Sequence, residues 1–102
     1  TLVWCTGEFG RTPKINDNGA GRDHWARGMS MFYAGGGIKG GQVIGKTDKT
    51  ASEPVESPYS PDDAAASFYH GIGIDPQTEY HTPDGRPVML VAKGNPIQEL
   101  WS

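Results

Sequence analysis

The stretch Thr1-Leu2-Val3-Trp4-Cys5, followed by Thr6-Gly7-Glu8-Phe9-Gly10-Arg11-Thr12-Pro13, decides the predicted fold. Its first five residues are a short apolar run of strand formers, typical of a buried strand in a parallel sheet. The acidic Glu8 follows the carboxyl end of that strand, where ligands bind in open α/β sheets. The segment therefore predicts an α/β fold with a mostly parallel central sheet, few helices and long Gly/Pro-rich loops.

Further along the chain, two apolar runs and one capped segment predict the remaining elements. Residues 29–34 indicate a second buried strand, and residues 42–44 a short third strand at an edge, before a polar loop over residues 46–59. The helix is expected to begin after Ser60, with Pro61 in the first turn and Asp63 placed for a capping box. It is expected to end at Gly71 or Gly73. Residues 96–101 favour one further helical turn.

The composition indicates a loop-rich part of a folded domain. The 102 residues include 15 Gly and 8 Pro, against only seventeen Leu, Ile, Val and Phe, with a net charge of −3. A disordered chain of this composition normally carries a larger net charge. A strand starting at residue 1 leads us to expect missing upstream sequence. Residues 1–102 would then be the C-terminal portion of one domain, because no linker divides them.

Several classes of protein and site are excluded at this stage. No apolar run approaches the roughly 20 residues that span a bilayer, and the mild acidity does not fit a nucleic-acid groove. A single cysteine, Cys5, excludes an internal disulfide framework, and it is expected to pack as a small apolar residue. Residues 40–47 match the P-loop formula by letter, but no helix pattern follows Thr47, so the glycines are read as turn residues.

The segments around Glu8 and His24 carry the chemistry of greatest interest. A carboxylate and an imidazole commonly hold a divalent metal, so Glu8 and His24 are candidate ligands. Arg11 and Arg22 are candidates for binding an oxyanion through bidentate hydrogen bonds. The alternative is that Glu8 only pairs with an arginine and that His24 only caps a turn.

The other titratable residues favour structural or solvent-facing roles. His70 lies at the expected end of the helix, where a cation suits the dipole. His81 lies in a turn-rich stretch and has no ligand-like partner close to it in the sequence. Asp62 and Asp63 are explained by helix capping.

The ordered motifs resemble a known family. Gly-Glu-Phe-Gly-Arg-Thr-Pro, then Gly21-Arg22-Asp23-His24-Trp25, the glycine run 35–41, Gly45-Lys46-Thr47-Asp48 and the helix at Ser60 occur in sequence. Together they resemble the C-terminal part of a bacterial sulfatase-like family of unknown function in the alkaline phosphatase superfamily. The resemblance covers nearly the whole chain. It implies an α/β sandwich with a metal pair, and a Thr, Ser or modified Cys nucleophile that lies upstream of this chain.

By position in that family, Glu8-Phe9-Gly10 resembles an Asp-His-Gly ligand motif and His24 resembles a later histidine ligand. The resemblance implies a divalent metal (Zn, Mg, Ca or Mn) on Glu8 and His24, and an anionic ester substrate steadied by Arg11 or Arg22. It also implies export to the periplasm or beyond. Phe9 stands where an imidazole ligand is expected, so the alternative hypothesis is a non-catalytic binding or structural protein that has lost a metal ligand. The metal, substrate, nucleophile and oligomeric state are left open.

We expect residues 1–102 alone to show no ester hydrolysis, because the implied nucleophile lies outside them. Aryl phosphate and aryl sulfate are the substrates to assay, with added Zn²⁺, Mg²⁺, Ca²⁺ or Mn²⁺. Turnover that disappears in Glu8→Ala would contradict this expectation and show a complete site within the chain.

Overall fold

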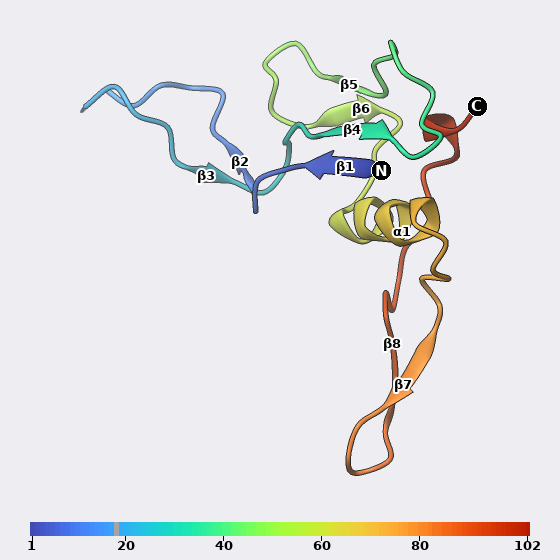
Figure 1. Cartoon of the computed structure of the whole chain (residues 1–102). Helices are drawn as coiled ribbons and strands as arrows, with labels where there is room; N and C mark the ends of the chain where they lie inside the picture. Colours follow the sequence, from blue (N-terminus) through green and yellow to red (C-terminus); the bar gives the residue numbers. More distant parts are fainter. Residues whose placement is uncertain (18) are drawn as a thin grey trace. The chain divides into compact units, whose positions relative to one another are not determined.

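The computed structural model describes residues 1–17 and 19–102. The described residues form eight short strands, one α-helix and one 3₁₀ turn (Figure 1). Their order is β1 (Leu2–Cys5), β2 (Gly10–Arg11), β3 (His24–Trp25), β4 (Phe32–Gly35), β5 (Lys46–Thr47), β6 (Pro54–Glu56), α1 (Pro61–Gly71), β7 (Glu79–His81), β8 (Pro87–Met89) and the 3₁₀ turn (Gln98–Leu100).

The strands form four separate two-stranded antiparallel sheets, β1–β4, β2–β3, β5–β6 and β7–β8. The predicted α/β sandwich with a mostly parallel central sheet is therefore wrong: the described residues form one α-helix and four small antiparallel sheets. Parallel neighbours need a crossover of a dozen or more residues, usually a helix. Here, β2–β3, β5–β6 and β7–β8 are joined by turn-rich loops, and α1 follows all six of the earlier strands. The apolar run at the start does form a strand, but burial alternates along β1, as in a strand with one face in solvent.

Three other sequence-based boundaries need correction. The second strand is shorter than predicted and lies at Phe32–Gly35, within and just beyond residues 29–34. Residues 42–44 form no strand, whereas the supposed loop 46–59 contains the β5–β6 hairpin. The helix at Pro61–Gly71 and the turn at Gln98–Leu100 are confirmed.

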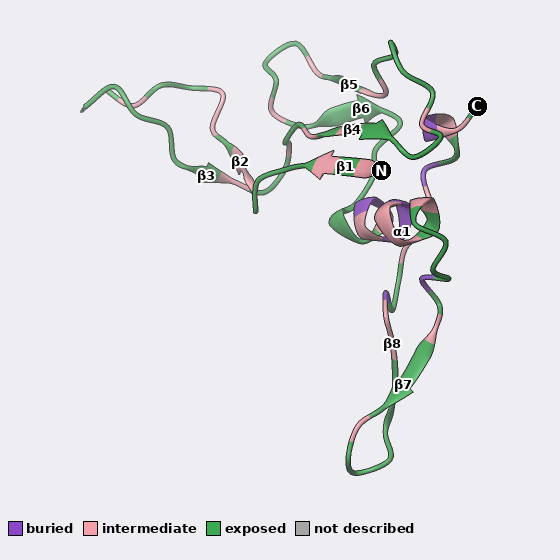
Figure 2. Cartoon of the chain, in the orientation of Figure 1, coloured by how far each residue is buried: buried purple, intermediate pink, exposed green. Residues whose placement is uncertain are grey.

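The chain divides into two compact units. The first consists of residues 1–3, 33–41 and 59–102, and the second of residues 4–32 and 42–58. Figure 2 shows that the buried residues gather on α1 and on the segments that follow it. The first unit holds every buried residue of the described chain: Ala64, Ala66, Ser67, Pro76, Val91, Ile97 and Leu100.

Helix α1 is defined by hydrogen bonds at both of its ends. The Ser60 hydroxyl accepts from the Asp63 amide at 3.1 Å, and the Asp63 carboxylate accepts from the Ser60 amide at 2.9 Å, which completes the predicted capping box. At the other end, Gly73 adopts a positive φ of 83°. The Gly73 amide donates to His70 O, and the Ile74 amide donates to Tyr69 O, which together make a Schellman motif.

Two polar side chains of α1 fasten the C-terminal segment to the helix. Ser67 is fully buried; its hydroxyl donates to Asp63 O at 2.7 Å and accepts from the Ile97 amide at 2.8 Å. The Asp63 carboxylate also accepts from the Asn95 amide at 2.9 Å. The buried polar group is thus satisfied in both directions, and Ile97 is placed in the core beside α1.

Tyr33 fastens β4 to the same helix. Its hydroxyl donates to Ala64 O at 2.7 Å, and burial raises the pKa of Tyr33 to about 12. The carbonyl of Leu100 accepts from the Lys39 amide at 2.7 Å. One hydrogen bond thus joins β4 to the helix, and another joins Lys39 to the C-terminal turn.

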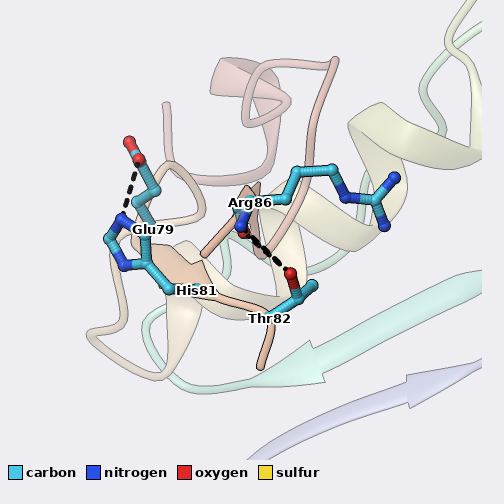
Figure 3. Close-up of polar contacts among 4 residues, drawn as sticks. All are labelled: Glu79, His81, Thr82 and Arg86. Atoms are coloured by element: carbon cyan, nitrogen blue, oxygen red, sulfur yellow. Dashed lines mark hydrogen bonds and ion pairs between the residues drawn. The ribbon is translucent and has the colours of Figure 1, made fainter. Parts of the chain in front are cut away.

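A hairpin of β7 and β8 also belongs to the first unit. Glu79, Tyr80 and His81 pair with Met89, Val88 and Pro87, respectively. The Gly85 amide donates to Thr82 O, and Gly85 has a positive φ of 87°, so the reversal is a turn closed by a glycine. The Thr82 hydroxyl also accepts from the Arg86 amide at 3.1 Å (Figure 3).

We expect the stability of the protein to fall with acid partly through Asp63. Burial raises the pKa of its carboxyl, but hydrogen bonds from the Ser60 and Asn95 amides and from the Ser60 side chain outweigh burial and hold the pKa below the ordinary value of 3.8. A lowered folded-state pKa adds stability above the unfolded value, and this stability is lost as the pH falls through the folded value.

The variant Asp63→Asn keeps the size and shape of the side chain and one of its two acceptor oxygens, but its amide does not titrate. The wild-type advantage over Asp63→Asn in urea unfolding should be constant near neutral pH and shrink as the pH falls below about 4. Ser60→Ala should cost about 1 kcal/mol. Wild type and Asp63→Asn following parallel curves down to strong acid would contradict the assignment.

Candidate functional site

The β2–β3 ladder brings together two of the residues singled out from the sequence. Gly10 pairs with Trp25, and Arg11 pairs with His24. The loop between the two strands is closed by backbone hydrogen bonds from Thr12 N to Asp23 O at 2.9 Å and from Asn16 N to Gly21 O at 2.7 Å. This closure brings Arg22 close to Thr12 and Pro13 at the start of the loop.

Both arginines are tethered by backbone carbonyls. Arg22 Nη1 donates to Thr12 O at 3.0 Å and to Pro13 O at 3.2 Å, and Arg11 Nη1 donates to Arg22 O at 3.1 Å. Neither guanidinium forms an ion pair with a carboxylate in the described part of the chain. A guanidinium has five N–H donors, so each keeps donors for a ligand. Neither guanidinium is therefore neutralised by a direct ion pair among the described residues, although Asp23 of the same loop is bonded to Asn16.

These arginines line an open hollow of about 390 Å³ in the second unit. Its larger and polar lining residues are Phe9, Arg11, Pro13, Arg22, Ser30 and Thr47, and the rest are glycine, alanine and methionine. Arg11 and Arg22 are the only charged residues of the lining. No described carboxylate reaches it, and neither Glu8 nor His24 is part of it. Electrostatically, the hollow suits an anion.

Thr47 is placed by the turn of the β5–β6 hairpin. The Asp48 carboxylate accepts from the Ser52 amide at 2.8 Å and from the Thr50 hydroxyl at 3.2 Å. The Ser52 amide, followed by the other donors of the turn, lowers the pKa of the Asp48 carboxyl below its usual value. Ser52 O in turn accepts from Trp25 Nε1 at 2.7 Å, which fastens this turn to β3.

Phe9 and His24 stack on each other. Their ring centroids are 3.8 Å apart with an interplanar angle of 32°, and the Arg11 guanidinium carbon lies 5.4 Å from the Phe9 centroid. The resemblance places Phe9 at the position of a metal-binding imidazole, and here its ring packs against the second candidate ligand instead. Stacking covers a face of the His24 ring, whereas a ligating nitrogen lone pair lies in the ring plane.

No group of three or more His, Cys, Asp or Glu side chains within residues 1–17 and 19–102 could hold a metal ion. Glu8 and His24 are both exposed. A catalytic zinc ion usually has three protein ligands, so these two residues supply at most part of such a site.

The remaining sequence-based expectations have mixed outcomes. His70 and His81 are exposed, as expected; His70 meets Trp101 edge-on at 4.9 Å, and His81 Nε2 lies 3.9 Å from Glu79 Oε1 (Figure 3). Cys5 is exposed, so its expected packing as an apolar residue is wrong. A strand, β5, follows the glycines of the P-loop-like segment, as expected of turn glycines. No described helix is long and apolar enough to cross a membrane.

A comparison with protein families identifies the family of this chain. Residues 1–101 match the family described as a protein of unknown function, DUF1501. The chain belongs to the DUF1501 family. No curated protein and no solved structure matches it.

Sequence reasoning missed two residues of the hollow in this DUF1501 chain, Ser30 and Thr47. Their hydroxyls have no hydrogen-bond partner within the described residues, and both residues are exposed. They are 17 positions apart in sequence and come from different segments. No local pattern marks such a pair, because only the folded loops bring them to one hollow.

We expect Phe9→Leu to release the His24 ring. A stacked aromatic pair contributes roughly 0.5–1.5 kcal/mol beyond its buried area, and the low end applies to an exposed pair. The ring current of Phe9 should shift the C–H protons of His24 upfield in NMR spectra, and this shift should disappear in Phe9→Leu. His81, beside Glu79 rather than an aromatic ring, serves as the internal reference. Unchanged His24 resonances would rule out the stack.

Proposed function

We propose that this chain is part of an exported, metal-dependent hydrolase of sulfate or phosphate esters, and that Arg11 and Arg22 hold the anionic group of the ester. The observation that carries the proposal is the hollow with two arginines and no carboxylate in its lining. The reaction class and the export are inferred from the resemblance of the motifs to the sulfatase-like family. The hollow supplies the binding chemistry.

The geometry of the arginines supports oxyanion binding. A guanidinium matches the spacing of sulfate and phosphate oxygens and forms paired, charge-assisted hydrogen bonds with them. Arg22 is already fixed by two carbonyls, and Arg11 by one, so less side-chain freedom is lost when an anion binds. Because neither guanidinium is engaged in an ion pair among the described residues, both keep N–H donors for a ligand.

The metal part of the proposal rests on the donor chemistry of Glu8 and His24. A carboxylate and an imidazole suit Zn²⁺ or Mn²⁺, and carboxylate oxygen alone suits Mg²⁺ or Ca²⁺. The stack with Phe9 leaves the in-plane nitrogens of His24 available. A bound divalent ion would act as a Lewis acid on the ester. Further ligands and the nucleophile would have to be contributed by residues other than those described.

A second candidate function is non-catalytic binding of an anionic ligand. The observation that favours it is Phe9, whose ring packs on His24 at the position where the resemblance expects a ligand. In that case the two arginines would still bind the anion, but Glu8 and His24 would hold no metal. The two functions therefore share the hollow and differ at Glu8 and His24.

The first test of the proposed function measures anion binding by the two arginines. Arg11→Gln and Arg22→Gln should each weaken binding of inorganic sulfate roughly tenfold or more in calorimetric titrations of the intact protein, since a hydrogen bond to a charged group contributes about 1.5–3 kcal/mol. Arg27→Gln is the matched control, because Arg27 lies over Trp25 and does not line the hollow. Equal affinity in all four proteins would refute the anion site.

The metal arm separates the two candidate functions. Metal content of the intact protein should fall in Glu8→Ala and in His24→Ala, together with hydrolysis of aryl sulfate or phosphate. Unchanged metal content in both variants would remove the metal assignment. Loss of anion binding in the arginine variants, without any metal or turnover in the wild type, would favour the binding protein.

A further inference from the structure

We propose that the β7–β8 hairpin pairs with the same hairpin of a second copy of this chain, along the outer edge of β7. The two copies are related by a two-fold axis that passes beside Tyr80, and the two hairpins together form one antiparallel sheet with the strand order β8–β7–β7–β8. The inference is independent of the proposed function, because it depends on the hairpin of the first unit and not on the hollow.

The hydrogen-bond pattern of the hairpin decides which backbone groups of β7 face outward. The Thr82 amide donates to Arg86 O at 2.9 Å, so these two residues are a hydrogen-bonded pair. Hydrogen-bonded pairs recur at every second residue of an antiparallel ladder, and the register of β7 with β8 is unbroken. Tyr80 is therefore bonded to β8, whereas the N–H and C=O groups of Glu79 and His81 point away from β8.

The outer edge of β7 is open, and the outer edge of β8 is partly blocked. No described backbone group outside the hairpin bonds to Glu79 or His81, and Figure 1 shows the hairpin extending away from α1. Pro87 takes the outward position of β8 opposite His81, and a proline has no N–H to donate. Because a proline at an edge is one way in which proteins prevent strand pairing, a further strand is expected to add to β7.

The backbone of β7 can pair with itself in one favourable two-fold register. Antiparallel pairing centred on Tyr80 places Glu79 of each copy opposite His81 of the other. Their outward N–H and C=O groups then exchange both hydrogen bonds, as the closely spaced pairs of an antiparallel ladder do. The neighbouring two-fold registers would instead place Glu79 opposite Glu79 or His81 opposite His81.

The side chains at this edge favour a second copy as the partner. His81 Nε2 lies 3.9 Å from Glu79 Oε1 within one chain, and the two side chains are 65% and 52% exposed, respectively. Across the axis, each carboxylate meets an imidazole of the other copy, whose N–H group can donate to it. Complementary polar and charged pairs directly across two strands stabilise their pairing, whereas like charges oppose it. The edge of β7 is therefore complementary to itself in charge as well as in its backbone.

The opposite face of the hairpin is apolar and exposed. Tyr80 and Val88 are cross-strand neighbours and are 58% and 41% exposed. A two-stranded hairpin alone is marginally stable in water, and additional strands that extend an apolar face stabilise it. In the proposed sheet, Tyr80 lies directly opposite Tyr80 of the second copy, which joins the two apolar faces. Strand β7 has only 3 residues, so we expect a weak dimer that forms at high protein concentration.

Amide exchange and sedimentation velocity of the intact protein, over a series from micromolar to millimolar concentration, test the pairing. Dimerisation should slow exchange of the Glu79 and His81 amides several-fold. The Tyr80 amide, which is bonded within the hairpin, should change little. This alternation distinguishes edge pairing from stacking of two apolar faces, and the Thr82 amide reports whether the hairpin is intact.

Variants of the edge add a second readout. His81→Pro removes one outward amide from each copy but no bond within the hairpin, so it should weaken the dimer roughly tenfold or more. Glu79→Lys should weaken the dimer several-fold, and the double variant Glu79→Lys/His81→Glu should restore it, because opposite charges again face each other across the axis. Val88→Thr is the matched control: it alters the exposed face on β8, keeps a β-branched side chain and leaves the edge of β7 unchanged.

Three results would overturn the proposal. The first is a protein that stays monomeric up to millimolar concentration. The second is a dimer whose affinity is the same in wild type, His81→Pro and Glu79→Lys. The third is protection of the Glu79 and His81 amides without any change in sedimentation, which would show that another segment of the same protein covers the edge of β7.

Discussion

The fold of the first unit depends on the Asp63 carboxylate and the neighbouring Ser67 hydroxyl in α1. The Asp63 carboxylate accepts from the backbone amides of the N-cap residue Ser60 and of Asn95, and the Ser67 hydroxyl accepts from the Ile97 amide. These two side chains therefore fix both the start of the helix and the C-terminal segment beside it. All seven buried residues lie in this unit. Few large apolar side chains are buried in this unit. The hydrogen bonds therefore position segments that side-chain packing would position in a larger core.

The second unit has no buried residue among those described, so a packed core does not hold its loops in place. Its loops are held by hydrogen bonds between side chains and backbone: Arg22 donates to Thr12 O and Pro13 O, Trp25 donates to Ser52 O, and the Asp48 carboxylate accepts from the Ser52 amide. Such bonds specify the geometry of exposed loops, and a neutral one, such as that from Trp25 to Ser52 O, contributes only about 0.5–1.5 kcal/mol. The residues that line the hollow thus belong to the least buried part of the chain, in keeping with the usual location of binding residues on loops.

Helix α1 was predictable from the sequence because its determinants are local. Ser60, Pro61 and Asp63 encode the start within four residues, and Gly73 encodes the end. The orientation of the sheets was not predictable from the apolar run at residues 1–5, because the same side chains suit a parallel or an antiparallel neighbour. Strands of two or three exposed residues, such as β5 and β7, carry no usable alternation. The arginines of the hollow were recognisable by their chemistry, whereas Ser30 and Thr47 depend on non-local contacts.

The stack of Phe9 on His24 and the charge of the hollow belong to one local arrangement. The pairing of β2 with β3 places Arg11 opposite His24. The Phe9 ring packs on the His24 imidazole, and the Arg11 guanidinium carbon lies 5.4 Å from the centroid of the Phe9 ring. An imidazole in place of Phe9 would add a titratable group beside two guanidiniums, and its protonation there would be disfavoured by like charge. A neutral ring avoids that repulsion and leaves Arg11 and Arg22 as the charged groups that face the ligand. The departure at Phe9 therefore weakens the case for a second metal ligand, but it is compatible with a hollow that binds an anion through arginine alone.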